Sequence, residues 1–383
     1  MARTLGESVA RRQINSMAKD AILVLQGGGA LGAYECGVYK VLAPYFKKHG
    51  YSLSVVAGTS IGAINAAVIA TRYNKDSDHG ARALEELWTQ RITARSVPFF
   101  PPLPVFEPYN AIWTSLLFGN PHLFSPFVFG WNFFAPIFWN GFTQFYETEV
   151  MRKTLEELLA PSGEYKGIEP CLVVTAVDIE SGRPVFFDSG QTPITAEEVM
   201  ASCALPPWLP SKCHAGRHYW DGGLSSNTPL REALSALQKN ESSRERLSEE
   251  YEVFIISVMP LEGELPKRNW DVWSRISQIT FADKTEYDET VSNVMNSYLN
   301  FVKAAQKASH ELPASSALKS LIEQEYKELK DEGRVQLNIT RIQRKALPGE
   351  ATSREIDFSP ERIEALISQG VQDAQQVLKL AAK

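Results

Sequence analysis

The sequence predicts an α/β protein built around a mostly parallel sheet. Two strand-like apolar runs, at residues 21–26 and 51–60, each lead through a glycine-containing turn into a helical segment. Strand, turn and helix, repeated twice, are typical of parallel α/β folds. The chain has 383 residues, which is enough for one such domain with insertions.

The remaining elements follow in chain order. The glycine turn after the first strand leads into a helix that Gly50 closes, and "IGAINAAVIATRYN" forms the second helix. Beyond residue 268 the chain is mainly helical, and its last helix begins with Ser359 as N-cap and Pro360 as first helical residue. Further strands are predicted at 171–177, 184–187, 217–220, 253–258 and 335–343.

Residues 97–146 form an unusually apolar segment. They hold 17 of the 40 aromatic residues and 8 of the 22 prolines, and Pro108 to Tyr146 includes no Asp, Glu, Lys or Arg. Proline prevents one long helix, and so much aromatic surface is unfavourable in water. Three interpretations stay open: a cover that lines an acyl pocket, a surface for membrane contact or dimerisation, and ordinary core.

Composition excludes some classes of protein. The formal net charge is -6, so the sequence lacks the excess of basic residues that is typical of nucleic-acid-binding proteins. We find no secretory signal and no apolar run long enough to span a bilayer, and therefore expect a cytoplasmic protein that can touch membranes peripherally. The four cysteines form no C-x-x-C pair, and we expect all of them to be buried thiols: Cys36, Cys171, Cys203 and Cys213.

The second turn, Gly58-Thr59-Ser60-Ile61-Gly62, matches the pattern G-x-S-x-G. In a nucleophile elbow the serine lies on a strained strand-to-helix turn, and flanking glycines avoid clashes there. The helix N-terminus then stabilises negative charge on the reacting oxygens. The alternative is that Ser60 is only a helix cap.

The first turn, "QGGGALG", supplies a second feature. Successive glycines let backbone N–H groups of Gly27, Gly28, Gly29 and Ala30 approach one oxygen, as in an oxyanion hole. A dinucleotide fingerprint would use Gly27, Gly29 and Gly32, but it also requires an acidic residue at the end of the second strand. That strand ends in Ala-Gly-Thr-Ser, which disfavours the dinucleotide site.

A base for Ser60 is predicted at Asp221. A short strand delivers Asp221 into the turn made by Gly222 and Gly223, where the carboxylate can reach a serine hydroxyl directly. The alternative is an aspartate that only caps its turn. None of the six histidines has a supporting motif for a serine–histidine pair.

Together these segments resemble the patatin-like phospholipase family. The resemblance rests on four stretches in the family's order and covers about residues 20–260: "GGGALGAYECGVYKVL", "GTSIGAIN", "ASCALPPWLP" and "DGGLSSNTP". It implies a three-layer sandwich and a Ser60–Asp221 dyad, with Gly27 to Ala30 as the oxyanion loop. Gly32, Gly58, Gly62, Gly222 and Gly223 support these motifs.

The resemblance also implies partners and domains. It implies a lipid or phospholipid substrate and no metal or cofactor. We expect a catalytic domain at 20–260, with 97–146 as an insertion, followed by a mainly helical extension at 261–383; oligomers are compatible with it. One departure is Leu31, where the family usually has Arg or Lys.

Two rival functions remain open at this point. One is an esterase with a Ser–His–Asp triad, for which His310 is the only histidine after Asp221. The other is a non-catalytic lipid-binding protein on a degenerate hydrolase fold.

Overall fold

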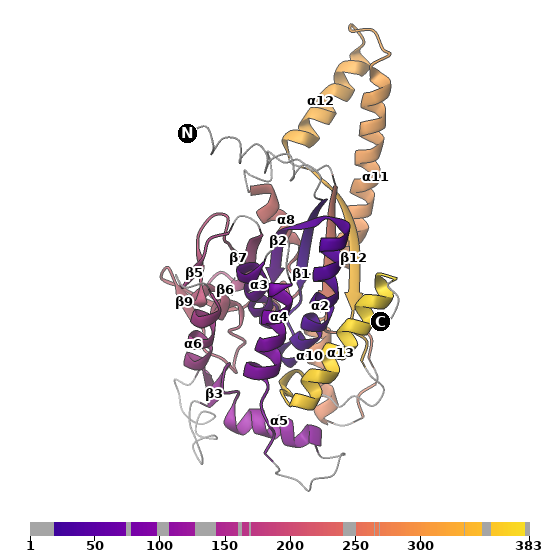
Figure 1. Cartoon of the computed structure of the whole chain (residues 1–383). Helices are drawn as coiled ribbons and strands as arrows, with labels where there is room; N and C mark the ends of the chain where they lie inside the picture. The colour runs from indigo at the N-terminus through magenta and orange to yellow at the C-terminus, as the bar shows by residue number, and fades with distance from the viewer. Residues whose placement is uncertain are drawn as a thin grey trace, which may run out of the picture.

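The fold was analysed in a computed structural model of the chain (Figure 1). The structure describes residues 19–73, 78–97, 107–126, 143–159, 163–167, 170–239, 250–263, 265–267, 269–332, 334–346 and 354–379.

An eight-stranded mixed sheet forms the centre of the molecule, with the order β12-β11-β1-β2-β6-β10-β9 and β7 paired with β6. The pairs from β12 to β6 are parallel, and β7, β10 and β9 add antiparallel pairs. The predicted α/β fold with a mostly parallel sheet is therefore confirmed. The strands are β1 (Lys19–Leu25), β2 (Tyr51–Gly58), β6 (Cys171–Asp178), β7 (Pro184–Asp188), β9 (Lys212–His214), β10 (Arg217–Asp221), β11 (Glu250–Ser257) and β12 (Gln336–Gln343).

Helices cover both faces of this sheet, and the alternation along β1 explains how. Successive side chains of a strand point to opposite faces. Leu23 and Leu25 belong to a large core shared with α2, α3, α4, α7 and α13. Ile22 and Val24 belong to a second core shared with α8. Both faces of β1 are thus buried, which accounts for its nearly continuous apolar sequence.

The described helices connect these strands. They are α2 (Gly32–His49), α3 (Ile61–Arg72), α4 (His79–Glu86), α5 (Glu107–Phe118), α6 (Glu149–Leu158), α7 (Ala196–Ser202), α8 (Leu230–Lys239), α10 (Asn269–Phe281), α11 (Glu286–Ser309), α12 (Ala317–Asp331) and α13 (Pro360–Val377). Short helical turns are η1 (Gly29–Leu31), η2 (Leu87–Ile92), η4 (Gly222–Leu224) and η5 (Arg354–Ile356), and two-residue strands pair β3 (Ser125–Pro126) with β4 (Tyr146–Glu147) and β5 (Glu164–Tyr165) with β8 (Ile194–Thr195). None of the described helices is long and apolar enough to cross a bilayer.

The C-terminal region is built into the same sheet. β12 pairs in parallel with β11 over eight residues, and α13 packs on α2 (Figure 1). The two helices approach closely at glycines: a Cβ added to Gly37 would lie 2.0 Å from the Ile367 carbonyl oxygen, and one added to Gly370 would lie 2.2 Å from that of Tyr34. The division into domains at residue 260 stays a prediction.

Two expectations from the sequence need comment. Cys36, Cys171 and Cys203 are buried, but the expectation for Cys213 is wrong because it lies exposed on the edge strand β9. Of residues 97–146, positions 98–106 and 127–142 lie outside the described residues. In the described part, α5 buries Ala111 and Ile112 and leaves Trp113 and Phe118 exposed.

Because α2 and α13 pack closely at Gly370, we expect an alanine there to destabilise the protein, although alanine normally favours a helix over glycine. Gly→Ala inside an exposed helix usually stabilises by about 1 kcal/mol. At Gly370 the added methyl group would meet the α2 backbone, so we expect Gly370→Ala to lower the free energy of unfolding by about 1–3 kcal/mol. Denaturant titration measures this, with Ser368→Ala on the exposed face of α13 as control. A stabilised Gly370→Ala protein would contradict the close packing.

Candidate active site

Ser60 lies on a strained turn between β2 and α3. Its backbone has φ 55° and ψ -125°, a left-handed conformation that a residue with a side chain rarely adopts. Its side chain makes no hydrogen bond that caps α3, so the alternative that Ser60 is only a helix cap is not supported. The turn requires its glycines, since a Cβ on Gly58 would lie 2.1 Å from the Gly62 carbonyl oxygen. The predicted elbow geometry is therefore present.

Asp221 is brought to Ser60 at the end of β10. The Asp221 carboxyl lies close enough to Ser60 for the serine hydroxyl to lower its pKa, and Asp221 Oδ1 accepts the Gly223 N–H at 2.7 Å. Asp221 thus both caps its turn and contacts the serine. It is 2% exposed. Burial raises the pKa of this carboxyl from 3.8 to about 7, although the hydrogen bonds from Ser60 and Gly223 oppose the shift.

The segment Ser202-Cys203-Ala204 holds both residues in place. Ser202 Oγ accepts a hydrogen bond from the Ser60 N–H at 2.9 Å, and the Cys203 thiol donates to the Ser60 carbonyl oxygen at 3.2 Å. The Ala204 carbonyl accepts the Asp221 N–H at 3.0 Å. The sequence identified this stretch only as a motif, and the structure explains it as the brace between nucleophile turn and acidic turn.

The glycine loop lies directly beside Ser60. A Cβ added to Gly27 would be 3.1 Å from the Ser60 Cβ, and Gly29 has φ +56°. Gly27 donates its N–H to the Asn227 carbonyl, and Leu31 donates to that of Gly28. The N–H groups of Gly28, Gly29 and Ala30 donate in none of the hydrogen bonds found between described residues. Three N–H donors are thus available in the loop that Gly27 places beside the serine.

Two buried amides that sequence reasoning did not assign hold this loop. Asn227 Nδ2 donates to the carbonyl oxygens of Gly27 at 3.0 Å and Phe281 at 2.6 Å. Gln26 Nε2 also donates to the Phe281 carbonyl, and its Oε1 accepts the N–H groups of Val258 and Met259. Gln26 could have been identified from the sequence, because it is a polar residue at the end of an apolar strand. Nothing in the sequence indicates that the Phe281 carbonyl would accept these hydrogen bonds.

A buried network joins the helices that follow the two turns. Asn65 on α3 donates to Glu35 on α2 at 2.7 Å and to the Gly32 carbonyl at 3.0 Å, and it accepts the Trp88 indole N–H at 3.0 Å. Burial raises the pKa of the Glu35 carboxyl well above its usual value. This network explains why polar residues occur inside two otherwise apolar helical segments.

Leu31 and His310 are now placed. Leu31 is buried in the main core, so an apolar residue suits the position. His310 is the exposed C-cap residue of α11 at the tip of the α11–α12 hairpin, at the end of the molecule opposite α5 (Figure 1). It takes no part in the hydrogen bonds that Ser60 or Asp221 makes within the described part of the chain.

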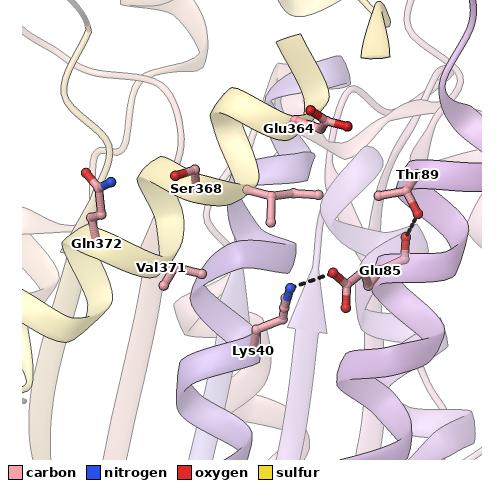
Figure 2. A pocket seen from close by; sticks show the side chains of 8 residues that line it. Lys40, Glu85, Thr89, Glu364, Ser368, Val371 and Gln372 are labelled. Carbon is pink, nitrogen blue, oxygen red and sulfur yellow. Dashed lines mark hydrogen bonds and ion pairs between the residues drawn. The ribbon is translucent and has the colours of Figure 1, made fainter. Parts of the chain in front are cut away.

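A pocket of about 440 Å³ lies elsewhere, between α2, α4 and α13 (Figure 2). Its lining includes the Lys40–Glu85 ion pair and Glu364 from α13. Neither Ser60 nor Asp221 lines it. This pocket is therefore separate from the serine site.

Serine hydrolases place a carboxylate or another base close to a serine hydroxyl and N–H donors near the same serine. The activated serine oxygen then attacks an acyl carbon. The chain belongs to the patatin-like phospholipase family: the model of that family matches residues 23–234, more than half of the chain. A second family model, described as patatin phospholipase, matches residues 279–382. Members of the family are serine hydrolases.

Two further likenesses are more distant. A cGAMP-activated phospholipase from Escherichia coli (strain TW11681) is 24% identical over 229 residues, which are 54% of this chain and 53% of that protein. The chain thus spans about half the length of this curated relative. The structure of VipD from Legionella pneumophila is 14% identical, covering 94% of this chain and 67% of that one, with a TM-score of 0.36, too low to define the fold.

The raised pKa of Asp221 predicts a cost in stability. The folded protein holds this proton between pH 4 and 7 and the unfolded chain does not, so the contribution of Asp221 to stability falls as pH rises through this window. The full shift corresponds to roughly 4 kcal/mol as an upper bound. We expect Asp221→Asn to raise the free energy of unfolding at pH 8 by about 1–3 kcal/mol, and by little at pH 4.

Asp178 provides a control of opposite sign. The Ser181 N–H and the Arg217 guanidinium lower its pKa to about 2, so Asp178→Asn should destabilise the protein at neutral pH. Urea titrations at both pH values measure both variants. If Asp221→Asn instead lowered the free energy of unfolding at pH 8, the conclusion that the buried Asp221 charge destabilises the folded protein would be wrong.

Proposed function

We propose that the chain hydrolyses carboxylic acyl esters of lipids, with phospholipids as the substrate class, through Ser60 as nucleophile and Asp221 as base. The observation that carries the proposal is the proximity of the Ser60 hydroxyl to a buried carboxylate whose pKa lies near 7. An ordinary carboxylate is a weak base at neutral pH, whereas a base with a pKa near the working pH is effective. Family membership supports the substrate class.

The reaction follows from this arrangement in two halves. Asp221 takes the Ser60 proton while Oγ attacks the ester carbon, and the protonated Asp221 then gives that proton to the leaving alcohol. A water molecule next attacks the acyl-enzyme with Asp221 again as base. The fatty acid leaves, and the Ser60 hydroxyl is restored.

The oxyanion of each tetrahedral intermediate needs donors that are fixed before reaction. We propose the backbone N–H groups of Gly28, Gly29 and Ala30 for this role. They directly follow Gly27, which lies beside Ser60, and they donate in none of the hydrogen bonds found between described residues. The hydrogen bonds of Asn227 and Gln26 fix this loop, and fixed donors are worth several kcal/mol to the transition state.

Contact with a membrane surface belongs to the same proposal. Trp113 and Phe118 of α5 are exposed, and exposed Trp208 packs against Phe145 with the two rings tilted and their centroids 5.5 Å apart. These aromatic side chains suit the boundary between headgroups and acyl chains. Much of 97–146 lies outside the described residues, so its role as cover or contact surface stays a prediction, as does the cytoplasmic location.

The proposal predicts that Ser60→Ala abolishes ester hydrolysis and does not change the fold. Without the Oγ nucleophile, release of fatty acid from phosphatidylglycerol–phosphatidylethanolamine vesicles should fall at least 1,000-fold, a loss of about 4 kcal/mol in transition-state stabilisation. Lipid mass spectrometry measures release, and a fluorophosphonate probe measures covalent labelling. Ser320→Ala, an exposed serine on α12, is the control.

Each outcome has a definite meaning. Labelling and release by wild type and Ser320→Ala, but not by Ser60→Ala, would support the proposal. Labelling without release would keep Ser60 as nucleophile and refute phospholipids as substrates. Equal labelling of Ser60→Ala and wild type would refute the nucleophile.

A further inference from the structure

Asp283 is a buried carboxylate that the serine mechanism does not use. It follows the end of α10 by two residues. Its Oδ1 accepts the backbone N–H of Thr285 at 2.9 Å and the hydroxyl of the same residue at 2.6 Å. Its Oδ2 accepts the Ser257 hydroxyl at 2.6 Å and is also bonded to the Arg341 guanidinium. Asp283 therefore ties the turn after α10 to the strands β11 and β12.

A closed chain of bonds connects Asp283 with Gln26, the residue before the glycine loop. Gln26 Nε2 donates to the carbonyl of Phe281, two residues before Asp283, at 3.1 Å. Gln26 Oε1 accepts the N–H of Val258, the residue after Ser257, at 2.7 Å. The bond between Asp283 and Ser257 thus joins the two backbone anchors that hold the Gln26 side chain. Gln26 and Ser257 are fully buried, so water is not at hand to replace a lost bond.

The same two anchors hold the glycine loop itself. The Phe281 carbonyl also accepts the Asn227 amide at 2.6 Å, and that amide donates to the Gly27 carbonyl at 3.0 Å. At the other anchor, a Cβ added to Gly28 would lie 2.5 Å from the Val258 Cγ2. A shift of either anchor would therefore displace the backbone of the loop.

Arg341 of β12 supplies the charge that a buried carboxylate requires. Burial of an ionised carboxylate is unfavourable unless the group is paired and hydrogen-bonded. The Arg341 side chain is 16% exposed and is paired with Asp283. It also donates to the Thr285 hydroxyl at 2.9 Å and to Glu289 at 3.1 Å. The guanidinium thus balances the charge of Asp283 and fixes the same turn.

A purely structural role, attachment of β12 to the protein, is the alternative for this ion pair. β12 already pairs with β11 over eight residues, and α13 packs on α2. The C-terminal region therefore has extensive attachments besides the ion pair. What the ion pair adds is a fixed position for the Phe281 carbonyl, on which the two amides of the loop converge.

We propose that Asp283, paired with Arg341, is a positioning residue for the oxyanion loop. It fixes the two backbone anchors and, through them, the N–H donors of the loop. The proposal rests on the proposed function, because oxyanion donors act only if Ser60 attacks an ester. Donors that are fixed before the reaction stabilise the transition state more than the bound substrate. Loss of Asp283 should therefore slow turnover without weakening substrate binding.

Hydrolysis of p-nitrophenyl butyrate by the full chain tests this division. For Asp283→Ala we expect kcat to fall about 10- to 100-fold and KM to stay within about twofold of wild type, because only transition-state contacts are lost. Ser257→Ala removes one bond of the same chain without changing charge and should lower kcat about 3- to 10-fold. Asp288→Ala is the matched control, since it removes an ion pair of the same region that bonds to α8 instead. Circular dichroism checks that the variants fold.

A reaction without an oxyanion separates the loop from the rest of the site. In a Cys213→Ser background, which removes the exposed native thiol, iodoacetamide alkylates the thiol introduced by Ser60→Cys by substitution at carbon. We expect Asp283→Ala to leave this rate within about twofold, and to slow phosphonylation of Ser60 by a fluorophosphonate about 10- to 100-fold. An equal loss in both reactions would overturn the proposal, because Asp283 would then hold the whole site and not the loop.

Hydrogen exchange separates failure of this proposal from failure of the proposed function. The N–H groups of Val258 and Met259 are bonded to Gln26 Oε1 and should exchange about tenfold faster in Asp283→Ala. Unchanged exchange, or a kcat within about twofold of wild type in both folded variants, would overturn the proposal. If wild-type Ser60 is not labelled, the proposed function fails and the catalytic role of the loop fails with it. Exchange then shows separately whether Asp283 holds Gln26.

Discussion

The interaction between the Ser60 hydroxyl and the buried carboxylate of Asp221 is the one on which the rest of this site depends. It requires a serine in a left-handed backbone conformation and a carboxyl group taken out of water, and each is unfavourable by itself. The neighbouring motifs are arranged around these two costs. Ser202, Cys203 and Ala204 bind the backbones of both residues, which fixes the pair without placing a charge beside it.

The C-terminal region takes part in the same construction. The Phe281 carbonyl accepts hydrogen bonds from Asn227 and Gln26, and the Glu355 carbonyl lies where a Cβ on Gly29 would stand. β12 and α13 complete the sheet and its helical cover. Residues matched by the second family model thus support the glycine loop, which gives a physical reason for the two matched regions to occur in one chain.

The sequence predicted the parallel sheet, the elbow and the acidic turn because each has a strong local signal. A strand buried on both faces of the sheet has a continuous apolar sequence, as β2 does. The strained turn at Ser60 requires Gly58 and Gly62 on either side of it, and both are visible in the sequence. The carbonyl groups of Phe281 and Ala204 could not be predicted, since any residue type supplies a carbonyl. Cys213 was assigned wrongly because edge-strand exposure depends on sheet order, which composition does not reveal.

The most direct measurement of the central claim is the pH dependence of the rate at which a fluorophosphonate labels Ser60. If buried Asp221 is the base, the rate constant should rise about tenfold per pH unit at acidic pH and level off above its pKa of about 7. A rate that is constant down to pH 5 would mean that the carboxylate behaves as an ordinary exposed one. A rate that still rises above pH 9 would mean that Ser60 ionises without Asp221, and either result would contradict the account.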